Sequence, residues 1–153
     1  PEFMGQAREL GLDTRFMGTF WSMDAAPWAG VGEAADGFMG VMPYRYYDDE
    51  EGGEMLDYIR SVRPEYQPTG YIQGFLTAML FLEAADRVLE AGQELTADNL
   101  KAALNTIEDF DTGGLIGTPI SLPGNSIPVG RVYQYDASAQ RMEPVSDWIN
   151  LQE

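Results

Sequence analysis

The spacing of hydrophobic positions alternates between helix-like and strand-like in the first part of the chain. Residues 4–11 read as the end of a helix closed by a glycine. Residues 14–20 and 37–42 predict two short strands, and the second is apolar on both faces. A short run that is apolar throughout is typical of a strand buried in a parallel sheet. Between them, residues 21–32 are rich in small and aromatic side chains and predict a loop or a broken helix.

The middle of the chain predicts three helices. Acidic residues 48–51 are expected to open the first, which ends at Pro64. The second covers residues 71–91, and its apolar positions surround the helix until Glu83, so most of it is expected to be buried. Thr96 is expected to cap the third.

Short β runs follow residue 112. Residues 128–135 alternate as a strand, 136–140 predict a turn, and 142–149 predict a closing strand or extended tail. The order of elements indicates an α/β layer structure. Two parallel strands and a C-terminal hairpin cannot cover the faces of four helices, which favours missing sequence.

Five stretches of the chain occur in an informative order. They are residues 7–19, 34–41, 71–75 with 84–85, 109–117 and 144–149. Together they resemble the C-terminal part of a periplasmic binding protein of the leucine/isoleucine/valine-binding family, the receptors of branched-chain amino-acid ABC importers. The resemblance implies a bilobed type I fold, with two Rossmann-like three-layer α/β lobes joined by three crossovers, that is incomplete in this chain.

That resemblance implies how the chain is divided. Residues 1–3 are expected to be a cloning-site remnant, 4–43 part of the second ligand-binding lobe, and 44–153 the crossover plus C-terminal elements of the first lobe. The abrupt start inside a helical pattern also favours truncation. A fragment is expected to cover the open faces of its long helix and its sheet edges with a second copy, through a dimer or a swap.

The amino-acid composition argues against several classes of binding partner and of catalytic chemistry. The 25 acidic against 9 basic residues, with a net charge of −16, disfavour nucleic acid and anionic membrane surfaces. The chain has no Cys and no His, so it lacks disulfides, the commonest general base and the commonest metal ligand. No apolar run of about 18 residues predicts a membrane span, and no signal peptide is recognisable. No cofactor or metal is expected.

The resemblance implies non-catalytic capture of a small solute, such as an amino acid, an amide or a related carboxylate or aromatic compound. The closed protein would then dock on ABC permease subunits, in the periplasm or as an extracytoplasmic lipoprotein. A ligand-sensing domain of a receptor or regulator with the same fold stays an alternative. An enzyme is not expected, because Asp109 and Asp111 resemble turn formers rather than paired catalytic carboxylates.

The first candidate binding site is the loop after the first predicted strand, because ligands of open α/β sheets bind outside the carboxyl ends of strands. It contains Phe20, Trp21, Ser22, Met23 and Asp24. The resemblance implies an acidic residue at position 20, where relatives hold the ligand ammonium, and Phe20 cannot do this. Either Asp24 supplies the charge from a shifted loop, or the ligand has no ammonium group. Phe20 and Trp21 suit an apolar or aromatic ligand, or they pack in the hinge.

Three further residues complete the candidate set. Tyr71 matches a position where relatives present an aromatic ring to the ligand, although such a residue can also be wedged in the core. Gln73 and Tyr46 are weaker candidates. Tyr46 belongs to a tyrosine-rich run, 44–47, just beyond a strand, and these rings either line the cleft or stack on one another.

Overall fold

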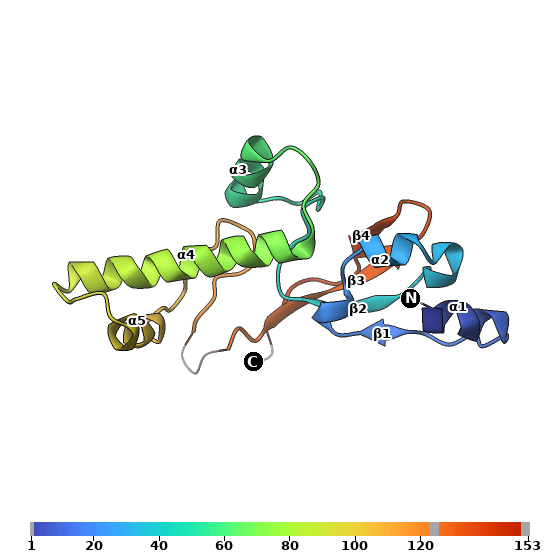
Figure 1. Ribbon diagram of the computed structural model, residues 1–153, viewed down its shortest axis with the longest axis horizontal. Coiled ribbons are helices and arrows are strands. Elements are labelled where there is room, and N and C mark those ends of the chain that lie inside the picture. The colour runs from blue at the N-terminus through green and yellow to red at the C-terminus, as the bar shows by residue number, and fades with distance from the viewer. Residues whose placement is uncertain (1, 123–125, 151–153) are drawn as a thin grey trace.

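The computed structural model describes residues 2–122 and 126–150, and its elements form two groups (Figure 1). The sheet group contains the strands together with helices α1 and α2. Its elements are α1 (Glu2–Glu9), β1 (Met17–Gly18), α2 (Ala26–Ala29), β2 (Met39–Met42), β3 (Val129–Asp136), β4 (Arg141–Pro144) and β5 (Ile149–Asn150). The helical group consists of α3 (Glu54–Val62), α4 (Thr69–Glu90) and α5 (Ala97–Leu104). Short 3-10 turns cover Phe20–Ser22 and Gly32–Ala35.

The sheet has the strand order β1-β2-β3-β4, with β5 paired to β3. β1 and β2 are parallel, with Met17 opposite Met39, whereas β2 and β3 are antiparallel. The hairpin of β3 and β4 was predicted from the alternating pattern and the turn, and it is confirmed. Because β3 and β4 pair within the same sheet as β2, the sheet crosses the boundary expected after residue 43. The assignment of residues 4–43 and 44–153 to two lobes stays a prediction, and position 1 of the expected remnant lies outside the described residues.

Two of the predicted strands differ in the structure. The first is only Met17–Gly18, without residues 14–16. It ends before Phe20 because the Ser22 amide bonds to the Thr19 carbonyl at 2.9 Å and the chain turns into a 3-10 helix. The second strand lies in a mixed sheet rather than a parallel one, and Val41 is exposed. Its side chains therefore alternate between the core and solvent.

Acidic residues 48–51 do not open a helix. Helix α3 begins at Glu54, after an extended Gly53. The side chains that were expected in a first helical turn are held elsewhere: the Tyr133 hydroxyl donates to Asp49 at 2.6 Å, and Arg131 donates to Glu51 at 3.2 Å. These tertiary bonds keep the segment in a loop.

Helix α4 has the expected extent, and Gly92 follows it with a left-handed φ of 68°. The expectation that most of it is buried is wrong in this structure. Phe81, Leu82 and Leu89 are each more than half exposed. Its buried positions are Ile72, Leu76, Ala84 and Val88. These positions cover one face, and α4 packs along α5 (Figure 1).

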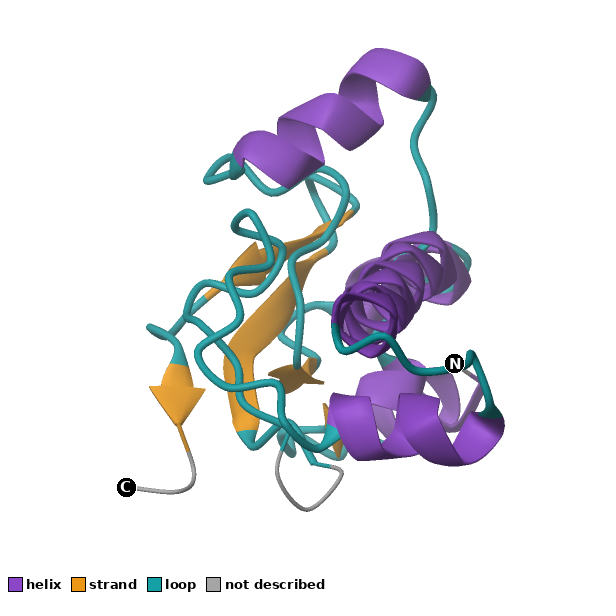
Figure 2. Ribbon diagram, turned by 90° about the vertical axis from the view of Figure 1, so that its left-hand side faces the viewer, coloured by secondary structure: helices purple, strands orange, loops and turns teal. Residues whose placement is uncertain are grey.

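Helix α5 begins with the expected cap, because the Thr96 hydroxyl accepts a hydrogen bond from the Asn99 amide at 3.2 Å. Viewed from the helical end of the molecule, α3 lies above α4 and α5 below it, with the strands alongside (Figure 2). The chain passes from the sheet group to the helical group through residues 43–53 and returns between residue 122 and β3, since the Leu122 amide still bonds to the Ile107 carbonyl beside α5 at 2.9 Å. Residues 113–117 approach the first of these crossings. These segments touch, since the Arg45 amide bonds to the Leu115 carbonyl at 2.8 Å.

Candidate functional site

The loop after β1 presents two stacked aromatic rings at the carboxyl edge of the parallel strands. The Phe20 and Trp21 ring centroids lie 4.2 Å apart. Phe20 is half-buried and packs against the core, whereas Trp21 is 77% exposed. The pair therefore offers an apolar surface to solvent where open α/β sheets bind ligands.

Ser22 and Met23 maintain the shape of this loop. The Ser22 hydroxyl donates to the Thr19 carbonyl at 2.8 Å, and the Ser22 carbonyl accepts from Trp28 Nε1 at 2.8 Å. Met23 is fully buried. The polar groups of Ser22 are thus occupied within the chain, which leaves the aromatic rings as the exposed part of the loop.

Asp24 connects the loop to two helices. Its Oδ1 accepts from the Ala26 amide at 3.2 Å at the start of α2, and its Oδ2 accepts from the Thr69 hydroxyl at 3.5 Å at the start of α4. The carboxylate also adds to burial in raising the pKa of Tyr44 and of Tyr66. Asp24 therefore places a negative charge beside a group of tyrosines at this edge of the sheet.

Tyr46 lies in the core, only 1% exposed. Its hydroxyl donates to the Met23 carbonyl, and its ring meets the Tyr133 ring edge-on at 4.8 Å. Burial is the main cause that raises the pKa of Tyr46. Of the two interpretations of the tyrosine run, packing describes Tyr46 in this structure, and a ligand contact by Tyr46 stays a prediction that its burial disfavours.

Tyr71 and Gln73 lie in the first turns of α4, and both are half-buried. Tyr71 packs against the core cluster. The Gln73 carbonyl accepts from the Thr77 hydroxyl at 2.9 Å. The bond between Asp24 and Thr69 brings the loop after β1 to the same helix start, so the candidate residues of these two segments share one region.

Thr69 and Tyr66 were not among the residues selected from sequence, whereas Tyr44 belongs to the tyrosine run 44–47 considered there. Thr69 is the first residue of α4, and its bond to Asp24 joins residues 45 positions apart, so no local pattern identifies it. Tyr66 carries no local signal either, because only the packing of residues far apart in sequence places it near Asp24.

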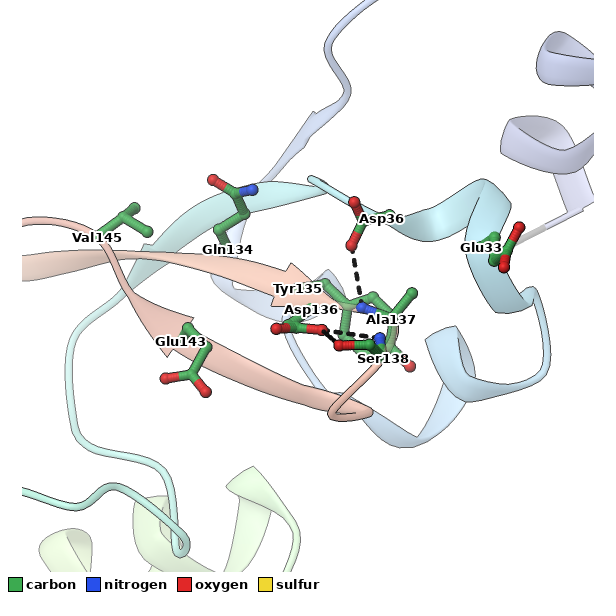
Figure 3. Close-up of a pocket in the computed structure, with 9 residues that line it drawn as sticks. All are labelled: Glu33, Asp36, Gln134, Tyr135, Asp136, Ala137, Ser138, Glu143 and Val145. Carbon is green, nitrogen blue, oxygen red and sulfur yellow. Dashed lines mark hydrogen bonds between the residues drawn. The ribbon is translucent and has the colours of Figure 1, made fainter.

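A hollow of about 690 Å³ lies elsewhere, at the amino end of β2 (Figure 3). Two of its carboxylates accept hydrogen bonds from the β3–β4 turn: Asp36 accepts from the Ala137 amide at 3.1 Å, and Asp136 accepts from the Ser138 amide and hydroxyl. The Ser138 hydroxyl is the main cause that lowers the pKa of Asp136. The bonds of Asp136 shape the β3–β4 turn, and the bond of Asp36 holds that turn against the residues before β2, so both carboxylates have a structural role.

Two further observations concern the described residues only. Within residues 2–122 and 126–150, no three or more potential metal-ligating side chains lie together in a way that could hold an ion. In the same part of the chain, no helix combines the length and apolarity needed to cross a bilayer.

The family of the chain is decided by its sequence profile. The profile described as periplasmic binding protein matches residues 1–141. The chain belongs to the periplasmic binding protein family. The resemblance read from the sequence is thereby confirmed. A comparison with curated proteins gave no match.

Solved structures support the fold. A branched-chain amino acid ABC transporter protein of Thermus thermophilus with bound valine matches at 19% identity, with a TM-score of 0.77, over 97% of this chain and 42% of its own. A leucine-binding protein of Thermotoga maritima matches at 16% identity, with a TM-score of 0.74, over 98% and 41%. A fatty acid ABC transporter substrate-binding protein of Thermomonospora curvata matches at 15% identity, with a TM-score of 0.73, over 96% and 39%.

These comparisons confirm the α/β class and the type I periplasmic-binding-protein fold. The chain spans about two fifths of the length of the solved structures it matches. The family consists of binding proteins, which agrees with the prediction that the chain is not an enzyme.

Proposed function

We propose that the protein containing this chain captures a small solute for an ABC importer, and that the loop after β1 supplies an aromatic contact to that solute. The observation that carries this proposal is the stacked Phe20–Trp21 pair, whose outer ring is 77% exposed at the carboxyl edge of the parallel strands. Tryptophan is enriched where proteins contact partners, because its large apolar ring can pack while its N–H stays available for a hydrogen bond.

The solute we propose is amphipathic, with its apolar or aromatic part against Trp21. Phe20 cannot bind an ammonium group, and both Asp24 oxygens already accept hydrogen bonds within the chain. A cation bound by Asp24 would share these oxygens with the Ala26 amide and the Thr69 hydroxyl. The similar structures include one with bound valine, a leucine-binding protein and a fatty acid ABC transporter substrate-binding protein, and these three solutes share an apolar part and a carboxylate.

The expected surroundings follow from the same proposal. We infer a periplasmic or otherwise extracytoplasmic location, and ABC permease subunits as partners of the solute-bound protein. Tyr71 and Gln73 are proposed as further contacts, since the Asp24–Thr69 bond holds the start of α4 beside the aromatic loop.

The test is solute binding by the full-length protein, with amino acids, amides, aromatic acids and fatty acids as probes in calorimetry. Trp21→Ala is expected to weaken binding about tenfold, which corresponds to about 1.4 kcal/mol. The matched control is Tyr58→Ala, because Tyr58 is an exposed aromatic residue on α3. Equal affinities of wild type and Trp21→Ala would contradict the proposed aromatic contact. If none of the probes binds, the proposal of solute capture is contradicted.

A further inference from the structure

Three chain segments meet at the junction between the sheet group and the helical group. The backbone of residues 45–55 contacts residues 113–115, with the Arg45 amide 2.8 Å from the Leu115 carbonyl and the Met55 amide 3.0 Å from the Gly113 carbonyl. Residues 146–148 form the third segment. The junction is tight: a Cβ added to Gly53 would lie 2.6 Å from the Gly114 Cα.

Two arginines link these segments through their Nε atoms. Arg45 Nε donates to the Gly114 carbonyl at 2.8 Å, which ties the first segment to the second. Arg131, at the start of β3, donates from Nε to the Ser146 carbonyl at 2.7 Å and so reaches the third. The Arg45 guanidinium also lies over the Trp148 ring, 5.6 Å from its centroid.

Both guanidinium groups lie near the carboxylate of Glu51. Glu51 Oε2 lies 3.2 Å from Arg131 Nη1 and 3.6 Å from Arg45 Nη1. The arginine side chains are only 10% and 11% exposed, whereas the Glu51 side chain is 70% exposed. Arg45 Nη1 is buried with no hydrogen-bond partner among the described residues, so the longer contact to Glu51 is its electrostatic compensation.

The two arginines and Glu51 differ in their exposure to solvent. The two guanidinium groups are buried, and the buried carboxyl of Asp49 interacts with both. Glu51 is their exposed acidic partner, so its side chain can rotate into water. When one partner of a buried charge cluster is removed, the remaining charges are left uncompensated, which is strongly unfavourable. Without Glu51, the two guanidinium groups would keep their interaction with the buried Asp49 but lose their exposed partner, so their mutual repulsion at the junction would be less well compensated.

We propose that Glu51 is the releasable member of an ionic latch, formed with Arg45 and Arg131, that restrains the angle between the sheet group and the helical group. With the latch formed, residues 45–55 stay against the start of β3. With Glu51 in solvent, the junction loosens and the helices swing more freely about the sheet. The consequence for solute capture rests on the function proposed above, whereas the latch itself does not.

Distance measurement between spin labels tests the latch without any solute. The chain has no Cys, so Glu90→Cys at the end of α4 and Ala139→Cys in the β3–β4 turn give one labelled pair, one label on each group. The labelled protein is diluted with unlabelled protein so that only distances within one molecule are read. Glu51→Gln is expected to broaden the distance distribution relative to wild type.

The matched control is Glu50→Gln. Glu50 is adjacent and also exposed, but it pairs with Arg141 of β4 at 3.2 Å rather than with the junction arginines. Its distribution is expected to match wild type. If Glu50→Gln broadens the distribution as much as Glu51→Gln, or if neither does, the latch is overturned.

Salt provides a second test that needs no substitution in the latch. Raising ionic strength to about 1 M screens the exposed Glu51 charge and is expected to broaden the wild-type distribution. The Glu51→Gln distribution should change less. A wild-type distribution that is insensitive to salt would contradict the latch, even if Glu51→Gln failed to fold. Failure of the full-length protein to bind solute would instead contradict the proposed function and leave the label distances unaffected.

Discussion

The sheet group and helix α4 bury their apolar residues to very different extents. In the sheet group, Tyr133, Tyr135 and Met42 are each 1% exposed or less. In the 22 residues of α4, only one face is buried, and Leu82 is 62% exposed. A helix that is apolar all round needs cover on more than one side to bury that surface. The sheet therefore depends on its own packing, whereas α4 depends on its internal hydrogen bonds and one packed face.

The largest expected difference in unfolding free energy comes from truncating one side chain to alanine in each region. Tyr133→Ala removes a buried ring, its edge contact with Tyr46 and its bond to Asp49, and is expected to cost about 3–5 kcal/mol of unfolding free energy. Leu82→Ala, on the exposed face of α4, should change the unfolding free energy by about 0.5 kcal/mol or less. Urea denaturation followed by circular dichroism measures both. Equal losses would show that α4 is buried to the same extent as the sheet.

The junction between the regions gives the next effect. Gly53→Ala would place a Cβ 2.6 Å from the backbone of Gly114, which cannot give way as a side chain could. Overpacking of this kind is expected to cost about 1–3 kcal/mol. Gly74→Ala is the control, because a Cβ at Gly74 meets nothing within 4 Å and alanine favours a helix. A junction that tolerates both substitutions equally would contradict the close approach of these segments.

The exposed face of α4 leads to a prediction about association. We expect the chain to self-associate through this face, and Phe81→Glu with Leu82→Glu to weaken the association at least about tenfold, or about 1.4 kcal/mol. Both residues are more than half exposed, so the substitutions should leave the fold intact. Sedimentation equilibrium measures the result. A wild-type chain that is monomeric at all concentrations would contradict the expected dimer.

A smaller effect is expected at the cap of α5. Thr96→Ala removes the acceptor for the Asn99 amide and should cost about 1 kcal/mol. The matched control is Thr77→Ala in the interior of α4, where the hydroxyl bonds back to the Gln73 carbonyl and alanine is the better helix former. Hydrogen exchange resolves the two sites. In Thr96→Ala, the backbone amides of α5 are expected to exchange faster, and those of α4 are not. Equal protection of the α5 amides in both variants would contradict a stabilising role of the cap.

Local sequence patterns predicted the parts of the fold that local interactions determine. Helix α4 and its glycine stop, the Thr96 cap and the β3–β4 hairpin all follow from spacing and turn chemistry within a few residues. The predicted start of the helix that is α3 was wrong because long-range interactions decide the conformation of residues 48–51. Asp49 and Glu51 bond to residues 84 and 80 positions away, and no local pattern encodes those partners.

The candidate site was predictable to the same degree. The rule that ligands bind at the carboxyl ends of strands selected Phe20 and Trp21, which the structure places together at that edge. The same rule selected Tyr46, which the structure buries against Tyr133 from a distant strand. Sequence thus located the edge of the sheet, whereas tertiary packing decides which aromatic rings there remain exposed.

The smallest expected effect is a pH dependence at the interface of the two regions. Burial is the main cause that raises the pKa of Asp49 above its ordinary value of 3.8, and the bond from Tyr133 opposes this. Between the ordinary and the raised pKa, the folded protein holds a proton that the unfolded chain has released. The contribution of Asp49 to stability is therefore full below pH 3.8 and is lost as pH rises through the raised pKa.

Asp49→Asn cannot lose a proton, so its unfolding free energy relative to wild type should rise from pH 3.8 upward and level off above the raised pKa. Burial also raises the pKa of Asp48, but that group is present in both proteins and cancels from the difference. Tyr133→Phe removes the bond that lowers the pKa of Asp49, so this variant should lose more stability than wild type over the same rise in pH. Urea denaturation across the acidic range measures all three proteins. A flat difference for Asp49→Asn would show that the carboxyl of Asp49 is as well solvated in the folded protein as in the unfolded chain.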